Sequence, residues 1–355
     1  MAGTSIDLAD LADAAFAADR VWVLDDPRER ASTQAIGIAE RLGLPFRRLA
    51  LSWNRLAPLA AVPPGGSLFG LRPLRGGDGV HAGDPRAMGL PLGPAGASGP
   101  ALTISAGWRA AAVALWLQHR FGTRTVHCTR PPLHGWRFDL LVVGRQDRLP
   151  EWSNVFPVLG TPHRLSVFAL CQAAAAWEAR LAHLPRPRIA LLVGGPVRGT
   201  DMVPAVAHGL GLRVAALARQ RGGSVLAMTS SRTGDEATAA LAAGLSSAMH
   251  LLHRRGEPGE DPYPGFLACA DAIVVTGDSI GRLSEACATA APVFIALPEL
   301  GGARQRRLHA GLITIEAARP LTDALAPWSR RPLDEAARVA QEIMRRFLLD
   351  PNRAD

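Results

Sequence analysis

The sequence contains no lysine, so all 39 residues counted as lysine or arginine are arginine. This absence excludes Schiff-base enzymes, P-loop ATPases and enzymes with a lysine general base, because each of them needs a side-chain amine. Phosphate recognition stays open, since a guanidinium group pairs with phosphate through two parallel hydrogen bonds. The codon bias of a GC-rich genome accounts for the missing lysines, and the heavy use of alanine agrees with that origin.

Aromatic residues and cysteines are also scarce. Aromatic residues make up only 5% of the chain, and no zinc-finger, RRM or helix-turn-helix signature is present, so we expect no nucleic-acid partner. The cysteines form no CxxC pair, which argues against structural zinc and is typical of a reducing compartment. The four cysteines are Cys128, Cys171, Cys269 and Cys287.

No apolar run reaches the roughly 18 residues of a membrane-spanning helix. The first twenty residues contain four aspartates and no early basic cluster, so they do not resemble a signal or transit peptide. We therefore expect a cytoplasmic protein, for which peripheral contact with the inner membrane is open.

Acidic residues are almost missing from one part of the chain. Between Arg41 and Arg137 there are twelve arginines and only two acids, Asp78 and Asp84, although the whole chain has a net charge of only +8. This excess predicts an anionic partner, such as phospholipid headgroups or a phosphorylated substrate. A solvated basic surface is the alternative interpretation.

Short apolar runs alternate with alanine-rich helical segments, which predicts an α/β protein with parallel sheets covered on both faces. The expected strands are Val21–Leu24, Phe46–Leu51, Leu102–Ser105, Thr125–Thr129, Asp139–Val143, Val155–Leu159, Ile189–Val193, Ser224–Thr229, Ala272–Thr276 and Val293–Leu297. The expected helices are Ser32–Leu42, Arg109–Arg120, Ser166–His183, Val203–Arg221, Asp235–Leu245, Leu283–Thr289 and Pro332–Leu349.

The tripeptide Pro185-Arg186-Pro187 interrupts this pattern and predicts a linker between two Rossmann-like, doubly wound domains. We expect a first domain over residues 1–184, a second domain over 185–331, and a C-terminal helix over 332–355 that packs back across the domains. In Pro63–Pro100, 18 of 38 residues are glycine or proline, which predicts a long loop on the first domain.

The strand Ala272–Thr276 is followed by a small polar turn and an expected helix start at Ser284 and Glu285. Ligands of parallel sheets bind beyond the carboxyl ends of the strands, where helix N-termini offer free N–H groups to anions. Ser279 can donate to a phosphate, and Glu285 can accept from both hydroxyls of a ribose. A helix start capped by Asp278 or Ser279 is the alternative.

This segment resembles the mitochondrial-fission ELM family, whose members were once labelled nucleoside-diphosphate-sugar epimerases and are similar in layout to GT-B glycosyltransferases. The matching motifs are Asp25-Asp26 with Gln34-Ala35, Ser105–Arg109, Arg137–Asp139, Asp147–Leu149, Gly160–Arg164, Gly194–Pro196, Thr229–Thr233 and the segment from Asp261. Two departures concern the first domain: the loop Asp26–Gln34 lacks an expected glycine, and Trp108 replaces a basic residue.

The resemblance implies that the two domains face a cleft, that residues 1–184 form the acceptor-side domain, and that residues 185–331 form the nucleotide-sugar-binding domain. The pair Gly194-Gly195 at a strand end lets backbone approach phosphate, although the sequence is not a GxGxxG motif and a turn is the alternative. Arg198 would neutralise a diphosphate. A second strand end contributes Ser230, Ser231 and Arg232, for which capping of the helix at Asp235 is the alternative. The single tyrosine, Tyr263, would stack on a base or anchor its loop.

Sugar transfer also needs a base near the acceptor hydroxyl. The candidates are Asp26, which follows the first strand, and His163, which follows the sixth and has the better intrinsic pKa, with a structural histidine as the alternative. Arg109, at a helix start, would hold an anionic acceptor, and His309 would lie at the domain interface or on a basic surface turn. We expect no metal and no cofactor besides the donor substrate.

Three functions remain open at this point. The first is a metal-independent GT-B-type glycosyltransferase that transfers a sugar from a nucleotide-sugar to an anionic lipid or an envelope glycan precursor. The second is a nucleotide-sugar 2-epimerase. The third is a non-catalytic, membrane-associated or division-related interaction protein on a transferase-like fold, because a fold by itself does not fix a function.

Overall fold

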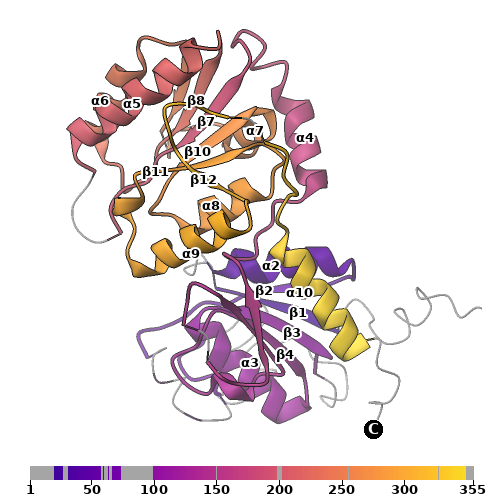
Figure 1. The fold of residues 1–355 in the computed structure, drawn as a ribbon. Helices are drawn as coiled ribbons and strands as arrows, with labels where there is room; N and C mark the ends of the chain where they lie inside the picture. Colours follow the sequence, from indigo (N-terminus) through magenta and orange to yellow (C-terminus); the bar gives the residue numbers. More distant parts are fainter. Residues whose placement is uncertain are drawn as a thin grey trace, which may run out of the picture.

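A computed structural model of the chain describes residues 20–26, 31–56, 59, 63, 66–72, 99–148, 150–197, 202–254, 256–326 and 328–348. These residues form two parallel six-stranded sheets, one above the other in Figure 1, with helices between the strands. The α/β fold class that the sequence predicts is confirmed. Most of the glycine- and proline-rich segment 63–100 and the site candidate Arg198 lie outside the described residues.

The first sheet has the strand order β2-β1-β3-β4-β5-β6. Its strands are β1 (Val21–Asp25), β2 (Arg47–Ala50), β3 (Leu102–Ala106), β4 (Arg124–Cys128), β5 (Leu140–Gly144) and β6 (Val155–Val158). Its helices are α2 (Ser32–Leu42) and α3 (Trp108–Phe121), with a short 3-10 helix at Gly135–Arg137. The central strands are buried along their whole length because helices cover both faces.

The second sheet has the order β12-β11-β10-β7-β8-β9. Its strands are β7 (Arg188–Leu192), β8 (Ser224–Met228), β9 (His250–His253), β10 (Ala272–Thr276), β11 (Val293–Ala296) and β12 (Arg319–Pro320). The helices around it are α4 (Val167–Trp177), α5 (Pro204–Arg219), α6 (Asp235–Leu245), α7 (Tyr263–Cys269), α8 (Ile280–Cys287) and α9 (Ala303–Thr314), with a 3-10 helix at Pro298–Leu300.

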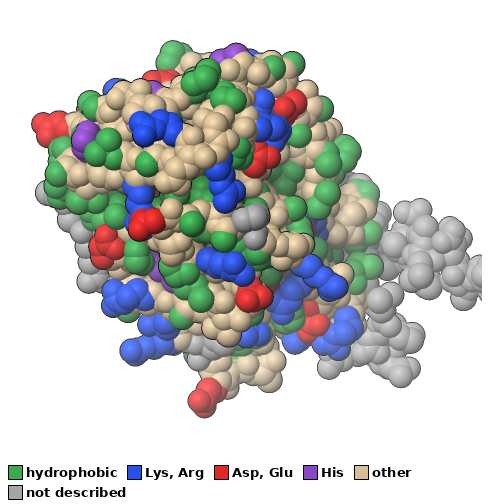
Figure 2. Space-filling model, turned by 45° about the horizontal axis from the view of Figure 1, so that its top comes forward, with side chains coloured by type: hydrophobic (Ala, Val, Ile, Leu, Met, Phe, Trp, Pro, Cys, Tyr) green, Lys and Arg blue, Asp and Glu red, His purple; other side chains and the backbone are tan. Residues whose placement is uncertain are grey.

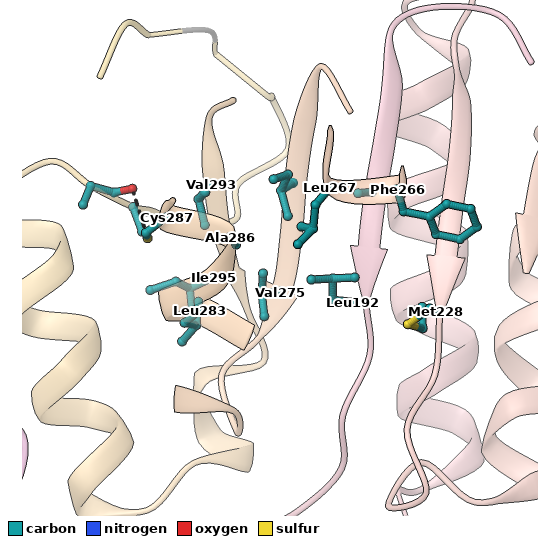
Figure 3. Close-up of a cluster of buried hydrophobic side chains, with 14 of the residues drawn as sticks. Leu192, Met228, Phe266, Leu267, Val275, Leu283, Ala286, Cys287, Val293 and Ile295 are labelled. Carbon is teal, nitrogen blue, oxygen red and sulfur yellow. Dashed lines mark hydrogen bonds between the residues drawn. The ribbon is translucent and has the colours of Figure 1, made fainter. Parts of the chain in front are cut away.

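Each sheet separates two hydrophobic cores. In β7, Ile189 and Leu191 face α5 and α6, whereas Ala190 and Leu192 face α7 and α8, as the two-residue period of a strand requires. Figure 3 shows the second of these cores, where Leu192 lies with side chains of β8, β10, α7 and α8. The first sheet is built in the same way, with α3 on one face and α2 on the other.

The chain crosses between the sheets twice. After β6 it enters α4, which packs against α7, and Leu181 and Leu184 beyond that helix belong to the core of the second sheet. The last helix, α10 (Glu335–Ile343), continues into a π-helical turn at Met344–Leu348 and packs against α2 of the first sheet, as Figure 1 shows. The boundary between independently folding domains at residues 184 and 185 stays a prediction.

Most element bounds agree with the sequence within two residues, and α2 and α6 agree at both ends. Three expectations were wrong in detail. The helix predicted at Leu283–Thr289 begins at Ile280, because Ser279 caps it by accepting from the backbone N–H of Arg282. The regular helix α4 ends at Trp177, short of the predicted His183. The final helix begins at Glu335, because Asp334 caps it, and not at Pro332.

Candidate functional site

The loops that follow β7, β8 and β10 meet at one edge of the second sheet, because parallel strands end their carboxyl termini on the same side. β7 leads to Gly194, β8 leads to Ser230, and β10 leads to Asp278. The predicted site residues at this edge are Gly194, Gly195, Ser230, Ser231, Arg232, Asp278 and Ser279. We call this group the second-sheet edge.

The carboxylate of Asp278 is the centre of the second-sheet edge. Its side chain is fully buried, it accepts from the hydroxyl of Thr276 at 2.6 Å, and it pairs with the guanidinium of Arg232. The same Thr276 hydroxyl accepts from the backbone N–H of Gly194 at 2.8 Å. The predicted substrate contact of Asp278 stays a prediction, and in this structure the carboxylate instead holds Arg232 in place.

Both predicted glycines lie where a side chain would collide. A Cβ at Gly194 would come within 2.1 Å of the Asp278 carboxylate, and a Cβ at Gly195 would come within 2.0 Å of the Arg232 carbonyl oxygen. Close approach of the backbone, and not a turn with positive φ, therefore explains why glycine occurs at both positions. The approach leaves this backbone packed directly beside the Asp278 carboxylate and the backbone of Arg232.

Ser230 and Ser231, which follow β8, do not cap the next helix, although the sequence left that interpretation open. Helix α6 has Gly234 as its N-cap and receives no side-chain cap, so Ser230 and Ser231 do not cap it. The backbone N–H of Ser230 donates to the hydroxyl of Thr233, and that hydroxyl donates to the carbonyl of Gly194 at 2.8 Å. Thr233, which belongs to a matching motif but was not predicted as a site residue, thus ties the loop after β8 to Gly194.

Ser284 and Glu285 lie in the second turn of α8. The Ser284 hydroxyl donates to the carbonyl of Ile280 and accepts from the backbone N–H of Thr161. This bond joins the part of the molecule built on the first sheet to the part built on the second sheet, which we call the first and second halves. The carboxylate of Glu285 accepts from the hydroxyl of Tyr263 at 2.5 Å. Burial, together with the neighbouring Glu285, raises the pKa of Tyr263 well above its usual value.

Glu285 and Tyr263 line a cavity of about 810 Å³ between the two halves of the molecule. Its other walls come from Thr33 and Arg41 of α2 and from Phe168 of α4. The cavity thus joins a carboxylate, a phenol, a guanidinium and an aromatic ring from both halves. A second cavity of about 530 Å³, between α4 and α7, has a mostly apolar lining and none of the predicted site residues.

At the end of β1, the side chain of Asp26 is fully buried and lies 3.4 Å from the Arg109 guanidinium. The backbone N–H of Asp26 donates to the hydroxyl of Ser32 at the start of α2. The Nε of Arg109 is buried and has no hydrogen-bond partner among the described residues. The structure therefore brings together Asp26 and Arg109, both predicted for the acceptor side.

His163 lies apart from that pair, where its backbone contacts Gly37 in the middle of α2. Burial lowers the pKa of His163 to about 4, with Arg41 adding to the decrease and Asp334 opposing it. Its Nδ1 has no hydrogen-bond partner among the described residues. A histidine with this pKa is neutral near pH 7, but it is a weaker base than the intrinsic value of histidine suggests.

Helix α9, which the sequence did not predict, brings two arginines to the other half of the molecule. Arg304 donates to the Asp147 carboxylate at 2.7 Å, and Arg307 donates to the Gln146 carbonyl at 2.7 Å. His309 lies on the opposite side of α9 against Gly277, and burial lowers its pKa. Arg282 is a further residue that sequence reasoning missed, and it donates to the Val193 carbonyl at the end of β7.

Within the described residues, no group of three or more histidine, cysteine, aspartate or glutamate side chains could hold a metal ion. Over the same part of the chain, no helix is both long and apolar enough to cross a membrane.

Comparison with solved structures finds proteins with a similar fold. UDP-GlcNAc 2-epimerase from Methanocaldococcus jannaschii superposes with a TM-score of 0.55 at 12% sequence identity, covering 92% of this chain and 99% of that one. MurG from Acinetobacter baumannii gives a TM-score of 0.43 at 11% identity, covering 91% and 90% of the two chains. The two-sheet architecture is that of GT-B folds, and at these identities the likeness concerns the fold alone.

Comparison by sequence identifies the family. The mitochondrial fission protein ELM1 of Arabidopsis thaliana is 27% identical over 249 residues, which cover 62% of this chain and 57% of that protein. The chain thus matches little more than half the length of this relative. The model of the family described as Mitochondrial fission ELM1 matches residues 31–347. The chain therefore belongs to the mitochondrial fission ELM1 family.

Proposed function

We propose that the protein binds a nucleotide-sugar between its two halves and transfers the sugar to an acceptor held by the first half. The observation that carries this proposal is the 810 Å³ cavity, into which Glu285 and Tyr263 bring a carboxylate and a phenol from the second half. A carboxylate in the second turn of a helix at a strand edge is suited to accept from the hydroxyls of a ribose. Binding would replace the hydrogen bond that Tyr263 now donates.

The second-sheet edge would hold the diphosphate of the donor. Helix α8 points its N-terminus, capped by Ser279, toward this edge, and free N–H groups at helix starts favour anions. Arg232 is partly exposed, so its remaining N–H groups can reach a phosphate while Asp278 fixes the guanidinium. The proposed contacts are Gly194, Gly195, Arg198, Ser230, Ser231, Arg232, Ser279, Ser284 and Glu285.

Asp26 and Arg109 would act on the acceptor. The carboxylate of Asp26 is the better candidate for the general base, because burial makes His163 a weak base. Arg109 would hold an anionic acceptor or stabilise the leaving group. An anionic lipid or an envelope glycan precursor as acceptor, and contact of the protein with the inner membrane, are further parts of the proposal that the arginine-rich first half supports.

A thermal-shift screen with UDP-, GDP-, ADP- and CMP-sugars tests the donor site. A ligand that binds only the native state raises the melting temperature by mass action. We expect one class of donor to raise it and Glu285→Ala to abolish that increase. Glu236→Ala, at an exposed glutamate of α6, is the control and should keep it. A full shift in Glu285→Ala would refute the ribose contact.

Two other functions remain candidates. The superposition on a UDP-GlcNAc 2-epimerase favours epimerisation as the second, and the two reactions differ in whether turnover needs an added acceptor. Turnover of the donor without any acceptor would replace our proposal by an epimerase. The sequence relative is a mitochondrial fission protein, so a non-catalytic interaction role is the third candidate. No shift with any donor would favour that role.

A further inference from the structure

The loop after β4, residues 129–138, exposes apolar side chains that it could have buried. Leu133 is 47% exposed and Trp136 is 57% exposed, although both belong to residue types that usually pack inside. The ring of Trp136 forms T-shaped contacts with the rings of His134 at 5.4 Å and Trp152 at 5.8 Å, measured between ring centroids. We call residues 129–138 the tryptophan loop.

The tryptophan loop is held in this conformation by specific bonds. The side-chain amide of Asn154 donates to the carbonyl of Gly135 at 3.0 Å and to that of Phe138 at 2.7 Å. From α3, Gln118 donates to the carbonyl of Arg137 at 2.9 Å. A Cβ at Gly135 would come within 2.4 Å of the Trp152 ring, so the backbone of the loop packs directly against that ring. The exposed side chains therefore stand on a fixed backbone.

The backbone of the tryptophan loop is also strained. Thr129 has φ of 76° and His134 has φ of 57°, although neither is glycine. A β-branched residue in the left-handed region is a true outlier, and such strain persists where the surroundings over-determine it, often at functional sites. The exposed Leu133 lies between the two strained positions, and the exposed Trp136 follows the second of them.

The charge around the tryptophan loop is positive. Arg130 and Arg137 are exposed, and neither forms an ion pair with any described residue. Between Arg41 and Arg137, the described part of the chain contains arginines and no acidic residue. Figure 2 shows arginine side chains over the lower half of the molecule, where the first sheet lies, with acidic side chains between some of them. Glu151 is the exposed acid nearest in sequence to Trp152, and it offsets only part of this charge.

We propose that the tryptophan loop is a membrane-docking surface, in which Leu133 and Trp136 enter the interface of a bilayer and Arg130 and Arg137 bind anionic headgroups. Tryptophan is favoured at membrane interfaces because its ring is apolar at one end and polar at the other. Basic residues beside inserted apolar groups select anionic lipids, and each contributes on the order of a fivefold gain in partitioning. Arg130 and Arg137 outnumber the exposed Glu151, and Asp139 is paired with Arg124, so a negatively charged surface is the partner that fits.

Flotation with lipid vesicles tests this surface on the full chain, without any donor or acceptor. One set of vesicles is phosphatidylcholine alone, and the other contains phosphatidylglycerol as well. We expect binding to the anionic vesicles only, with a marked decrease at high salt because exposed charges are screened. Binding to neither set, or equal binding to both, would overturn the proposal.

Two double variants test the apolar and the basic side chains of the tryptophan loop separately. One variant replaces Leu133 and Trp136 by alanine, and the other replaces Arg130 and Arg137 by glutamine. Each should weaken partitioning to anionic vesicles roughly tenfold or more. All four side chains are exposed, so both variants should keep the melting temperature of the unmodified protein. Unchanged partitioning in either double variant refutes the docking surface.

Matched controls come from the second half of the molecule. Phe168→Ala removes another aromatic ring that is 71% exposed, and the double change of Arg219 and Arg221 to glutamine removes two other exposed arginines. Both controls should partition as the unmodified protein does. A loss in the Phe168 variant equal to that of the loop variants would place docking on α4 instead. Glu285→Ala should not affect partitioning, which keeps this test separate from the donor site.

Discussion

The two sheets end in edges of opposite character, although both halves are parallel α/β units. At the second-sheet edge, the buried Asp278 is compensated by Arg232 and Thr276, and the backbone of Gly194 packs directly against it. The first half has its own buried Asp26 beside Arg109, but it also exposes Trp136 and Leu133. Arg130 and Arg137 on the same loop form no ion pair with any described residue. One edge is thus suited to a small polar ligand that needs close backbone contact, and the other is suited to an extended anionic surface.

The largest expected effect comes from filling the space at the second-sheet edge. Gly194→Ala would place a methyl group within 2.1 Å of the Asp278 carboxylate, so we expect a loss of about 3–4 kcal/mol in the free energy of unfolding. Urea denaturation measures the loss. Gly209→Ala is the control, because nothing lies within 4 Å of its Cβ, and it should leave stability equal or higher. Equal effects of the two changes would contradict the close packing.

The free energy of unfolding should depend on pH through His163, which lies in the segment between β6 and α4. The folded-state pKa of His163 is lowered to about 4, so the unfolded chain binds the extra proton first as pH falls. Stability is therefore complete above pH 6.5 and decreases by up to about 3 kcal/mol as the pH falls to 4. His163→Gln should remove this contribution, measured by urea denaturation at several pH values, while the buried His127, whose pKa is lowered to about 3, keeps its own contribution in both proteins. His119→Gln, at an exposed histidine of α3, should not.

The third prediction compares the two arginine–carboxylate pairs. Arg232→Gln leaves the buried Asp278 without its cation and should lower the free energy of unfolding by about 2 kcal/mol. Arg109→Gln should cost about 1 kcal/mol, because Arg109 lies 3.4 Å from Asp26 and contributes a weaker contact. Denaturation of both variants in the same buffer decides the order. A larger loss for Arg109→Gln would reverse our comparison of the two edges.

The smallest effect is expected at the contact between the halves. Arg304→Gln removes a partly exposed ion pair with Asp147, which should cost about 0.5 kcal/mol at low salt and less at high salt. Arg213→Gln removes a similar surface pair with Asp323 inside the second half. We expect both to have similar effects on stability. A loss of more than 2 kcal/mol for Arg304→Gln would mean that this contact holds the two halves together.

The strands were predictable because strands buried on both faces appear as continuous apolar runs, as in Ala272–Thr276. Helix α9 was not predicted, because its first two turns carry Arg304, Arg306 and Arg307 at the end where the helix dipole disfavours positive charge. Strand β9 (His250–His253) was missed because four residues bounded by histidines give little apolar signal.

The candidate site was predictable in part. Strand ends and small residues indicated the edge formed by Gly194, Ser230 and Asp278, because the topology of parallel sheets requires those loops to meet. Their pairing was not predictable. Arg232 and Asp278 are 46 residues apart, and nothing local to either residue shows that the carboxylate is buried beneath the glycine pair. The hydrogen bond from Tyr263 to Glu285 was hidden for the same reason.

The sequence by itself determined the α/β class, the positions of most strands, and the absence of lysine, because these depend on composition and local periodicity. The same is true of the arginine excess in the first half. Tertiary structure decided which of those arginines are paired and which are exposed, and that Trp136 points outward on a strained loop. It also decided that Asp278 faces inward, because burial and partners depend on contacts between residues far apart in the chain.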